Sequence, residues 1–424
     1  MIIRRDLYLE KLIERKGNGL IKIVTGIRRC GKSFLLNNLF IEHLRTERVD
    51  DAHIIRLSLE GVANRRYRDP EFSYAYVTER IKDSQTHYII IDEVQLMTDF
   101  VEVLNGFLQL QNVDVYVTGS NSRFLSSDIV TEFRGRGDVV RLHPLRFAEF
   151  ATAYADRQEA WDDYFIYGGL PQVLTYHSKE SKEAYLADLF DMVYKRDMID
   201  RNRLRGAENL DELLDVLASG VGSLTNPSKL EKTFRSVKNS AFSRSAIDRY
   251  ISCLEDAFIV SKALRYDVKG KRYIETPYKV YFEDVGLRNA RLNFRQIEEN
   301  RLMENIIFNE LRCRGFSVDV GLVESYSKNV DGLTVRKTHE IDFVVNRGSE
   351  RYYIQSAYEI PDSEKMAQEK ASLNRIGDSF KKIIVVRDYM KPRIDETGIV
   401  SVGLINFLDR KSTRLNSSHW LTSR

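Results

Sequence analysis

The chain has 424 residues, of which 43% are apolar and 30% are charged. This composition is typical of a folded globular protein of roughly two to four domains, and it excludes a disordered chain, a collagen and a low-complexity repeat. Three scattered cysteines exclude a disulfide framework. The charged N-terminus lacks the apolar core of a signal peptide, and no stretch is apolar enough to span a bilayer. We therefore expect a cytoplasmic protein without a membrane segment.

The last residues differ from the rest of the chain. Residues 409–424 are polar and aperiodic, and 409–419 (DRKSTRLNSSH) look like one reading frame of a sequencing adapter. We therefore exclude 409–424 as non-native read-through and expect the native C-terminus to be missing; a disordered tail is the alternative. The segment holds four of the 65 Lys and Arg residues and one of the 62 acids. Without it the charges balance, so the net charge of +3 is no evidence for nucleic-acid binding.

The first 150 residues alternate strand-like and helix-like segments. The strand candidates are Leu20–Thr25, Ile54–Leu59, Tyr88–Ile91, Val113–Val117 and a short Val139–Leu142. Between the first two, residues 33–44 place apolar side chains at near-helical spacing. Strands separated by helices predict a parallel sheet covered on both faces.

The remaining chain divides into three further regions. Residues 151–210 read as helices interrupted by Tyr167–Pro171. Residues 211–295 read as short helices followed by a hairpin. Residues 296–408 begin with a helix, Glu298–Gly315, and continue as alternating segments, which predicts a second, smaller α/β domain.

The strongest chemical signal is the segment Gly26-Ile-Arg-Arg-Cys-Gly-Lys-Ser33, which matches G-x-x-x-x-G-K-[ST] between a predicted strand and a predicted helix. Glycines let the backbone N–H groups approach a triphosphate, and the helix N-terminus adds a favourable dipole. Lys32 can reach the β- and γ-phosphates, and the Ser33 hydroxyl can ligate Mg²⁺. The residues expected to bind ATP and Mg²⁺ here are Gly26, Arg29, Gly31, Lys32 and Ser33.

Two acids end the next buried strand, His87-Tyr-Ile-Ile-Ile-Asp92-Glu93. An acid at this strand end lies beside the phosphate loop in a P-loop fold, so we expect Asp92 to hold Mg²⁺ through water and Glu93 to polarise the attacking water. The adjacent pair indicates ATP hydrolysis rather than a kinase or a small GTPase.

Two further polar positions follow. After Val113–Val117, Ser120 is the expected sensor of the γ-phosphate and Asn121 is the alternative; local capping of a turn would explain either residue. Farther on, Arg136, in preference to Arg134, is expected to act in trans on the ATP of a neighbouring subunit. That role implies a homo-oligomer, whereas a solvated arginine is the alternative.

These segments resemble the bacterial and archaeal AAA+ ATPases that carry a C-terminal domain of unknown function. The matching segments occur in the family's order and are GIRRCGKSFLL, HYIIIDEVQ, VYVTGSNSRFL, FRGRGDVVRLHPLRFAEF, YFIYGGLPQV, YFEDVGLRNA and EIDFVV. The resemblance implies a P-loop AAA+ core over residues 1–150 and a helical lid over 151–210. It implies ATP hydrolysis and leaves the biological role open.

Residues 226–272 carry eleven basic and five acidic residues, a local excess of +6. Helix, turn, helix and a basic hairpin suggest a winged helix within 211–295, whose second helix would begin near Arg244. Contact with double-stranded DNA is one expectation, and packing or contact with a protein partner is the alternative.

The C-terminal region, 296–408, is similar to the restriction-endonuclease-like core. Glu304 and Asp342 stand where metal-binding acids belong. However, Gln355 replaces an acid and Ala357 replaces the lysine. Metal-assisted cleavage needs those charges, so we expect no nuclease activity.

The sequence therefore predicts an ATP-hydrolysing molecular switch that acts on DNA or on a protein partner. The alternatives are an ATP-gated nuclease and an ATP-dependent interaction module with little turnover.

Overall fold

The computed structural model describes residues 2–119, 133, 135–191, 199, 207–238, 242–328, 334–360 and 362–409. The chain forms two compact units. Unit 1 contains residues 1–145 and two short segments, 170–172 and 256–258; unit 2 contains residues 146–169, 173–255 and 259 onward. No helix in these described ranges is long and apolar enough to cross a membrane.

Unit 1 is built on a five-stranded parallel sheet in the order β2-β3-β4-β1-β5. Its strands are β1 (Ile21–Thr25), β2 (Ile54–Ser58), β3 (His87–Asp92), β4 (Val113–Gly119) and β5 (Gly137–Arg141). The central strands are almost continuously apolar because both of their faces are buried. The parallel sheet predicted from the alternating segments is confirmed.

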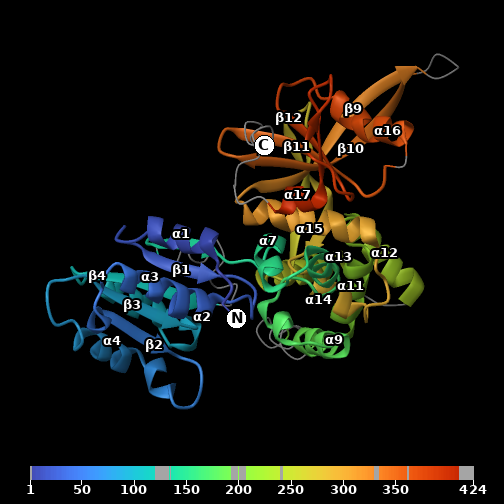
Figure 1. Cartoon of the computed structure of the whole chain (residues 1–424). Coiled ribbons are helices and arrows are strands. Elements are labelled where there is room, and N and C mark those ends of the chain that lie inside the picture. The colour runs from blue at the N-terminus through green and yellow to red at the C-terminus, as the bar shows by residue number, and fades with distance from the viewer. Residues whose placement is uncertain are drawn as a thin grey trace. The chain divides into compact units, whose positions relative to one another are not determined.

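Helices cover both faces of this sheet (Figure 1). On one face, α4 (Pro70–Thr78) and α5 (Phe100–Phe107) pack on a core that includes Ile23, Ile89 and Val115. On the other lie α1 (Asp6–Glu14), α2 (Lys32–Phe34) and α3 (Ile41–Thr46), the last two joined by a π-helical stretch. Phe40 of that stretch packs on Tyr88 and Tyr116, which project from alternate strand positions. The odd and even strand residues therefore build two separate cores.

Unit 2 contains a mixed nine-stranded sheet in the order β13-β14-β12-β11-β10-β9-β7-β8-β6. Its strands are β6 (Leu224–Thr225), β7 (Val260–Asp267), β8 (Arg272–Phe282), β9 (Ser317–Lys328), β10 (Thr334–Arg347), β11 (Glu350–Ala357), β12 (Lys381–Val386), β13 (Arg393–Ile394) and β14 (Val400–Gly403). Strand β7 pairs in parallel with β9, as Arg265 opposite Val320 illustrates. The hairpin predicted within 211–295 and the strands predicted within 296–408 thus share one sheet.

The helices of unit 2 precede and flank these strands. They are α7 (Phe147–Phe150), α8 (Arg157–Tyr167), α9 (Lys179–Asp188), α11 (Ala207–Ser219), α12 (Pro227–Lys238), α13 (Arg244–Asp256), α14 (Val285–Arg291), α15 (Glu299–Cys313), α16 (Ser363–Asn374) and α17 (Leu404–Leu408). The elements of this region follow in the order α11-β6-α12-α13-β7-β8, with β6 antiparallel to β8 and β8 antiparallel to β7, which is the order that the predicted winged helix requires.

Two glycine-containing segments pack against each other inside unit 2. Asp284 caps α14: its carboxylate accepts the Leu287 N–H at 3.1 Å and the Gly169 N–H at 2.7 Å. Complete burial raises the pKa of Asp284 to about 6, although these N–H groups favour its charged form. A Cβ on Gly168 would lie 2.1 Å from the Asp284 carboxylate, and one on Gly286 would lie 2.0 Å from the Tyr167 carbonyl oxygen. Neither position has room for a side chain.

We expect Gly286→Ala to lower the free energy of unfolding by about 1–3 kcal/mol, because the added methyl group overlaps backbone atoms that cannot rotate away. Gly377→Ala is the matched control, since a Cβ at Gly377 would meet no atom within 4 Å. Chemical denaturation of both variants measures the effect, and equal midpoints would contradict the steric argument.

Candidate functional site

The loop between β1 and α2 is shaped by residues with positive φ. The values are 147° at Gly26, 67° at Arg29 and 101° at Gly31. A Cβ on Gly26 would lie 2.0 Å from the Leu142 carbonyl oxygen, so only glycine fits there. Left-handed residues let a backbone curl into a concavity that binds anions, and here the concavity opens at the start of a helix. The loop thus has the form of a phosphate cradle.

Lys32 lies within this loop. Its ammonium donates to the Gly26 and Ile27 carbonyl oxygens, both at 3.1 Å, and the residue is 4% exposed. The backbone therefore fixes a positive charge at the centre of the cradle, where phosphate oxygens are the natural acceptors.

The parallel register brings three oxygen-bearing side chains to one point. The Ser33 hydroxyl donates to Asp92 Oδ1 at 2.8 Å, and the Thr118 hydroxyl donates to the same oxygen at 2.5 Å. Thr118 also accepts the Glu93 N–H at 2.8 Å. A serine hydroxyl beside a carboxylate is an oxygen donor set that Mg²⁺ prefers, so these residues fit the ion expected from the sequence. Thr118 was missed by the sequence analysis, although its place at the end of β4 was the available signal.

Glu93 has an unusual backbone conformation. Its φ is 56°, in the left-handed region, and its carboxylate accepts a hydrogen bond from the Gln95 side chain. Non-glycine residues adopt this conformation at a cost and do so frequently at functional sites. The turn directs Glu93 away from the path of β3, so Asp92 and Glu93 have different partners.

The remaining predicted positions are placed only in part. Ser120, Asn121 and Arg134 lie outside the described residues. Arg29 is exposed on the loop. Arg136 is also exposed, and its guanidinium donates to Asn105 Oδ1 on α5 at 3.1 Å.

A buried arginine that the sequence analysis did not single out donates hydrogen bonds to the backbone of the phosphate loop and of the residues after β5. Arg5, which is 3% exposed, donates to the His143 carbonyl oxygen at 2.7 Å and to the Cys30 carbonyl oxygen at 3.2 Å. It thereby ties the N-terminal segment to the phosphate loop and to the residues after β5.

Comparison with known proteins identifies the family. Residues 18–151 match the AAA domain, and residues 158–298 match a domain of unknown function (DUF8612). An uncharacterized protein of Haemophilus influenzae is 32% identical over 415 residues, which are 96% of this chain and 98% of the relative. This chain belongs to that bacterial and archaeal family of AAA-domain proteins. An uncharacterized protein of Methanocaldococcus jannaschii is 27% identical over 399 residues, 89% of this chain and 82% of the relative.

Solved structures resemble this AAA-domain protein only loosely. The Aeropyrum pernix ORC1 protein in complex with DNA aligns with a TM-score of 0.32 and 12% identity, over 69% of this chain and 92% of that one. Protein VC1899 from Vibrio cholerae aligns with a TM-score of 0.21 and 12% identity, over 92% and 95% of the two chains. Scores this low carry no argument about function.

In unit 2 the structure brings Glu304 of α15 and Asp342 of β10 into one cluster, as the sequence predicted. Lys279 of β8, which the sequence analysis did not assign to it, lies between them: its ammonium is 2.8 Å from Glu304 and 3.9 Å from Asp342. Burial, followed by the Glu304 charge, raises the pKa of Asp342 to about 8. On β11, Ala357 is buried, and Gln355 adds only a neutral amide.

The basic segment presents part of its charge to solvent. Four of its five acids are paired with its own bases, in Arg235–Glu231, Arg244–Asp248, Lys262–Glu255 and Arg272–Asp267. Lys229 and Lys232 of α12, Arg249 of α13 and Lys271 of the hairpin turn are exposed. These exposed bases add positive charge to the surface of the segment.

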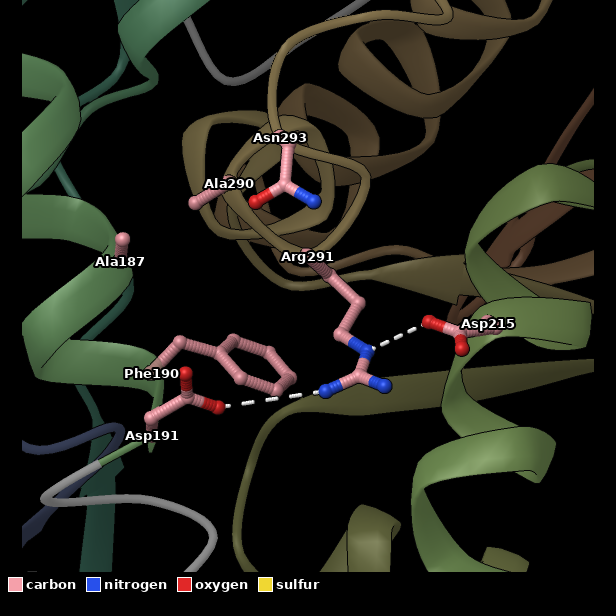
Figure 2. A pocket seen from close by; sticks show the side chains of 7 residues that line it. All are labelled: Ala187, Phe190, Asp191, Asp215, Ala290, Arg291 and Asn293. Carbon is pink, nitrogen blue, oxygen red and sulfur yellow. Dashed lines mark hydrogen bonds and ion pairs between the residues drawn. The ribbon is translucent and has the colours of Figure 1, made fainter.

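A small pocket of unit 2, with a volume of about 230 Å³, is lined by Ala187, Phe190, Asp191, Asp215, Ala290, Arg291 and Asn293. Figure 2 shows the Arg291 guanidinium reaching toward Asp215, at 2.7 Å, and Asp191, at 3.9 Å. It also pairs with Asp211 at 2.9 Å. These ion pairs join α14 to α11 and explain the charged lining without a ligand.

Three possible metal ligands meet in unit 1, although the histidines showed no metal-ligand spacing in the sequence. The ligand atoms of His53, Asp83 and His87 lie within 4.8 Å of one another. His53 contacts Asp83 at 3.0 Å, and His87 donates to the Gln85 carbonyl oxygen at 2.9 Å and accepts the Lys82 N–H at 3.4 Å. Hydrogen bonds therefore account for this cluster without an ion.

Proposed function

We propose that the protein is an ATP-hydrolysing AAA+ molecular switch that acts on DNA or on a protein partner. The observation that supports it most directly is the meeting of Ser33 and Asp92, 2.8 Å apart, beside a glycine-shaped loop that holds the Lys32 ammonium. A nucleotide triphosphate with Mg²⁺ is the ligand that this combination of backbone, cation and oxygen ligands would recognise.

The residues then have distinct roles. Lys32 and the N–H groups of the loop bind the β- and γ-phosphates. Ser33 and Asp92, the latter through water, would hold Mg²⁺, which neutralises phosphate charge when bound. Glu93 orients the attacking water, and Thr118 positions both acids through its two hydrogen bonds. Ser120 is the proposed sensor of the γ-phosphate.

The two alternatives are less well supported. An interaction module with little turnover would not need Glu93 in a strained turn next to Asp92. An ATP-gated nuclease would need a metal centre in unit 2, where Lys279 stands among the acids and β11 provides neither the acid nor the lysine.

DNA is the first candidate for the molecule on which the switch acts, because basic side chains on α12, α13 and the hairpin turn are exposed. Phosphate neutralisation by such groups gives weak, salt-sensitive binding without sequence preference. A protein partner is the alternative.

We predict that Lys32→Ala abolishes nucleotide binding, because the loop loses its only lysine. Glu93→Gln should bind ATP but hydrolyse it at least about a hundred-fold more slowly, as expected when one catalytic group is lost. Fluorescent-nucleotide titration and phosphate release measure the two effects. Equal turnover by Glu93→Gln and the parent would remove Glu93 from the mechanism.

We predict that Arg136 acts in trans within a homo-oligomer. ATPase activity per subunit should then rise with protein concentration, and mixing Arg136→Ala with Glu93→Gln subunits should restore part of the activity, because each supplies the group that the other lacks. Activity that is independent of concentration and never restored by mixing would leave Arg136 as the partner of Asn105 alone.

We predict that Lys229→Glu combined with Lys232→Glu weakens duplex DNA binding. The slope of log K against log salt should fall by about 0.9 for each lost phosphate contact. The control is Lys179→Glu with Lys391→Glu, an equal charge change at exposed positions of unit 2 outside the basic segment. No binding by the parent at low salt, or an equal loss in the control, would favour a protein partner.

A further inference from the structure

The carboxylate cluster of unit 2 contains a built-in cation. The Lys279 ammonium lies 2.8 Å from Glu304 Oε1 and 2.8 Å from Glu340 Oε1, and 3.9 Å from Asp342 Oδ1. The Lys279 side chain is 4% exposed, whereas Glu340 retains 35% exposure. Glu304 and Glu340 therefore lie at the distance of charge-assisted hydrogen bonds from one buried base, and Asp342 lies farther away as a third acid.

The positions of the residues on the strands and on α15 determine which side chains meet in this cluster. Glu340 and Asp342 are two residues apart on β10, so both side chains point to the same face. Glu304 reaches the cluster from α15, which packs against β8 and β10. On β8, Tyr281 follows Lys279 by two residues, and its hydroxyl donates to the same Glu304 oxygen at 2.5 Å. Strand β8 thus presents an ammonium and a hydroxyl together to the acid on α15.

The acid oxygens closest to the ammonium are those that a metal would need. A divalent cation binds carboxylate oxygens at about 2.0–2.6 Å, so an ion shared by Glu304 and Glu340 would have to sit where the ammonium already sits. Two cations in one partly buried space repel each other. The residues as they stand do not fit a metal.

We infer that the Lys279 ammonium takes the place of the divalent cation that a restriction-endonuclease-like core would hold, and that it fastens β8 to α15 and β10. The C-terminal part of unit 2 therefore needs no metal at this cluster. This assignment does not depend on ATP hydrolysis, because no residue of the phosphate loop takes part in it.

The test counts Mn²⁺ bound to the full chain by the electron paramagnetic resonance signal of the free ion, without nucleotide. All variants carry Asp92→Asn so that the phosphate-loop site lacks its acid ligand, and any site elsewhere in unit 1 is common to every variant. The background chain should bind no Mn²⁺ that depends on Asp342. Lys279→Gln should gain one Mn²⁺ per chain, because three acids and the amide oxygen of Gln355, for which the described residues provide no donor, are then left without their cation.

Two matched variants test whether the Mn²⁺ gained by Lys279→Gln binds at this acid cluster. Adding Asp342→Asn to Lys279→Gln should abolish the new site, and Lys279→Arg, which keeps a cation there, should gain none. Mn²⁺ binding by the background chain that Asp342→Asn removes would overturn the inference. A folded Lys279→Gln chain that gains no Mn²⁺ would also overturn it.

If Lys279→Gln fails to fold, the inference is tested by thermal unfolding of the background chain and of its Asp342→Asn variant, each with and without Mn²⁺. Excess Mn²⁺ should shift the midpoint of the background chain no more than that of its Asp342→Asn variant. A larger, metal-induced stabilisation of the background chain would show that the acids already hold a metal, whereas equal shifts support the inference.

Discussion

The candidate nucleotide site depends on the parallel register of β1, β3 and β4. Val24 lies opposite Thr118, and Ile91 lies opposite Val117, so the carboxyl ends of three strands stop at one edge of the sheet. The phosphate loop begins where β1 ends. The same edge therefore carries the loop, the acid pair and Thr118, without any long side chain having to bridge a gap. A shift of one residue in any pairing would turn Asp92 or Thr118 to the other face.

A second constraint acts in unit 2, where two glycine-containing segments pack on each other. Gly168 and Gly286 approach the opposite segment so closely that an added Cβ would overlap the Asp284 carboxylate or the Tyr167 backbone. The close approach of the two segments explains the glycines, and the capping of α14 explains Asp284. Neither explanation needs contact with a substrate.

Several buried charges in both units are paired with buried charges of opposite sign. In unit 1, Lys22 of β1 pairs with Asp114 of β4, which also accepts the Tyr116 hydroxyl. In unit 2, Glu310 lies between Arg146 at 3.2 Å and Arg314 at 2.8 Å. Removing one member of such a set leaves an uncompensated buried charge, so these residues fix which elements pack together. Lys279 belongs to the same class of interaction, with three acids around one ammonium.

The sequence by itself determined the parallel sheet, the phosphate loop and the acid pair, because each depends on residues that are close in the chain and follow a strict period or spacing. It also placed Glu304 and Asp342 in one cluster through the resemblance to a known core. Only the tertiary structure revealed Thr118 beside Asp92, Arg5 behind the loop and Lys279 among the acids. Each of these contacts joins residues 25 or more positions apart. Such contacts arise from strand register and helix packing, which no local pattern of residues encodes.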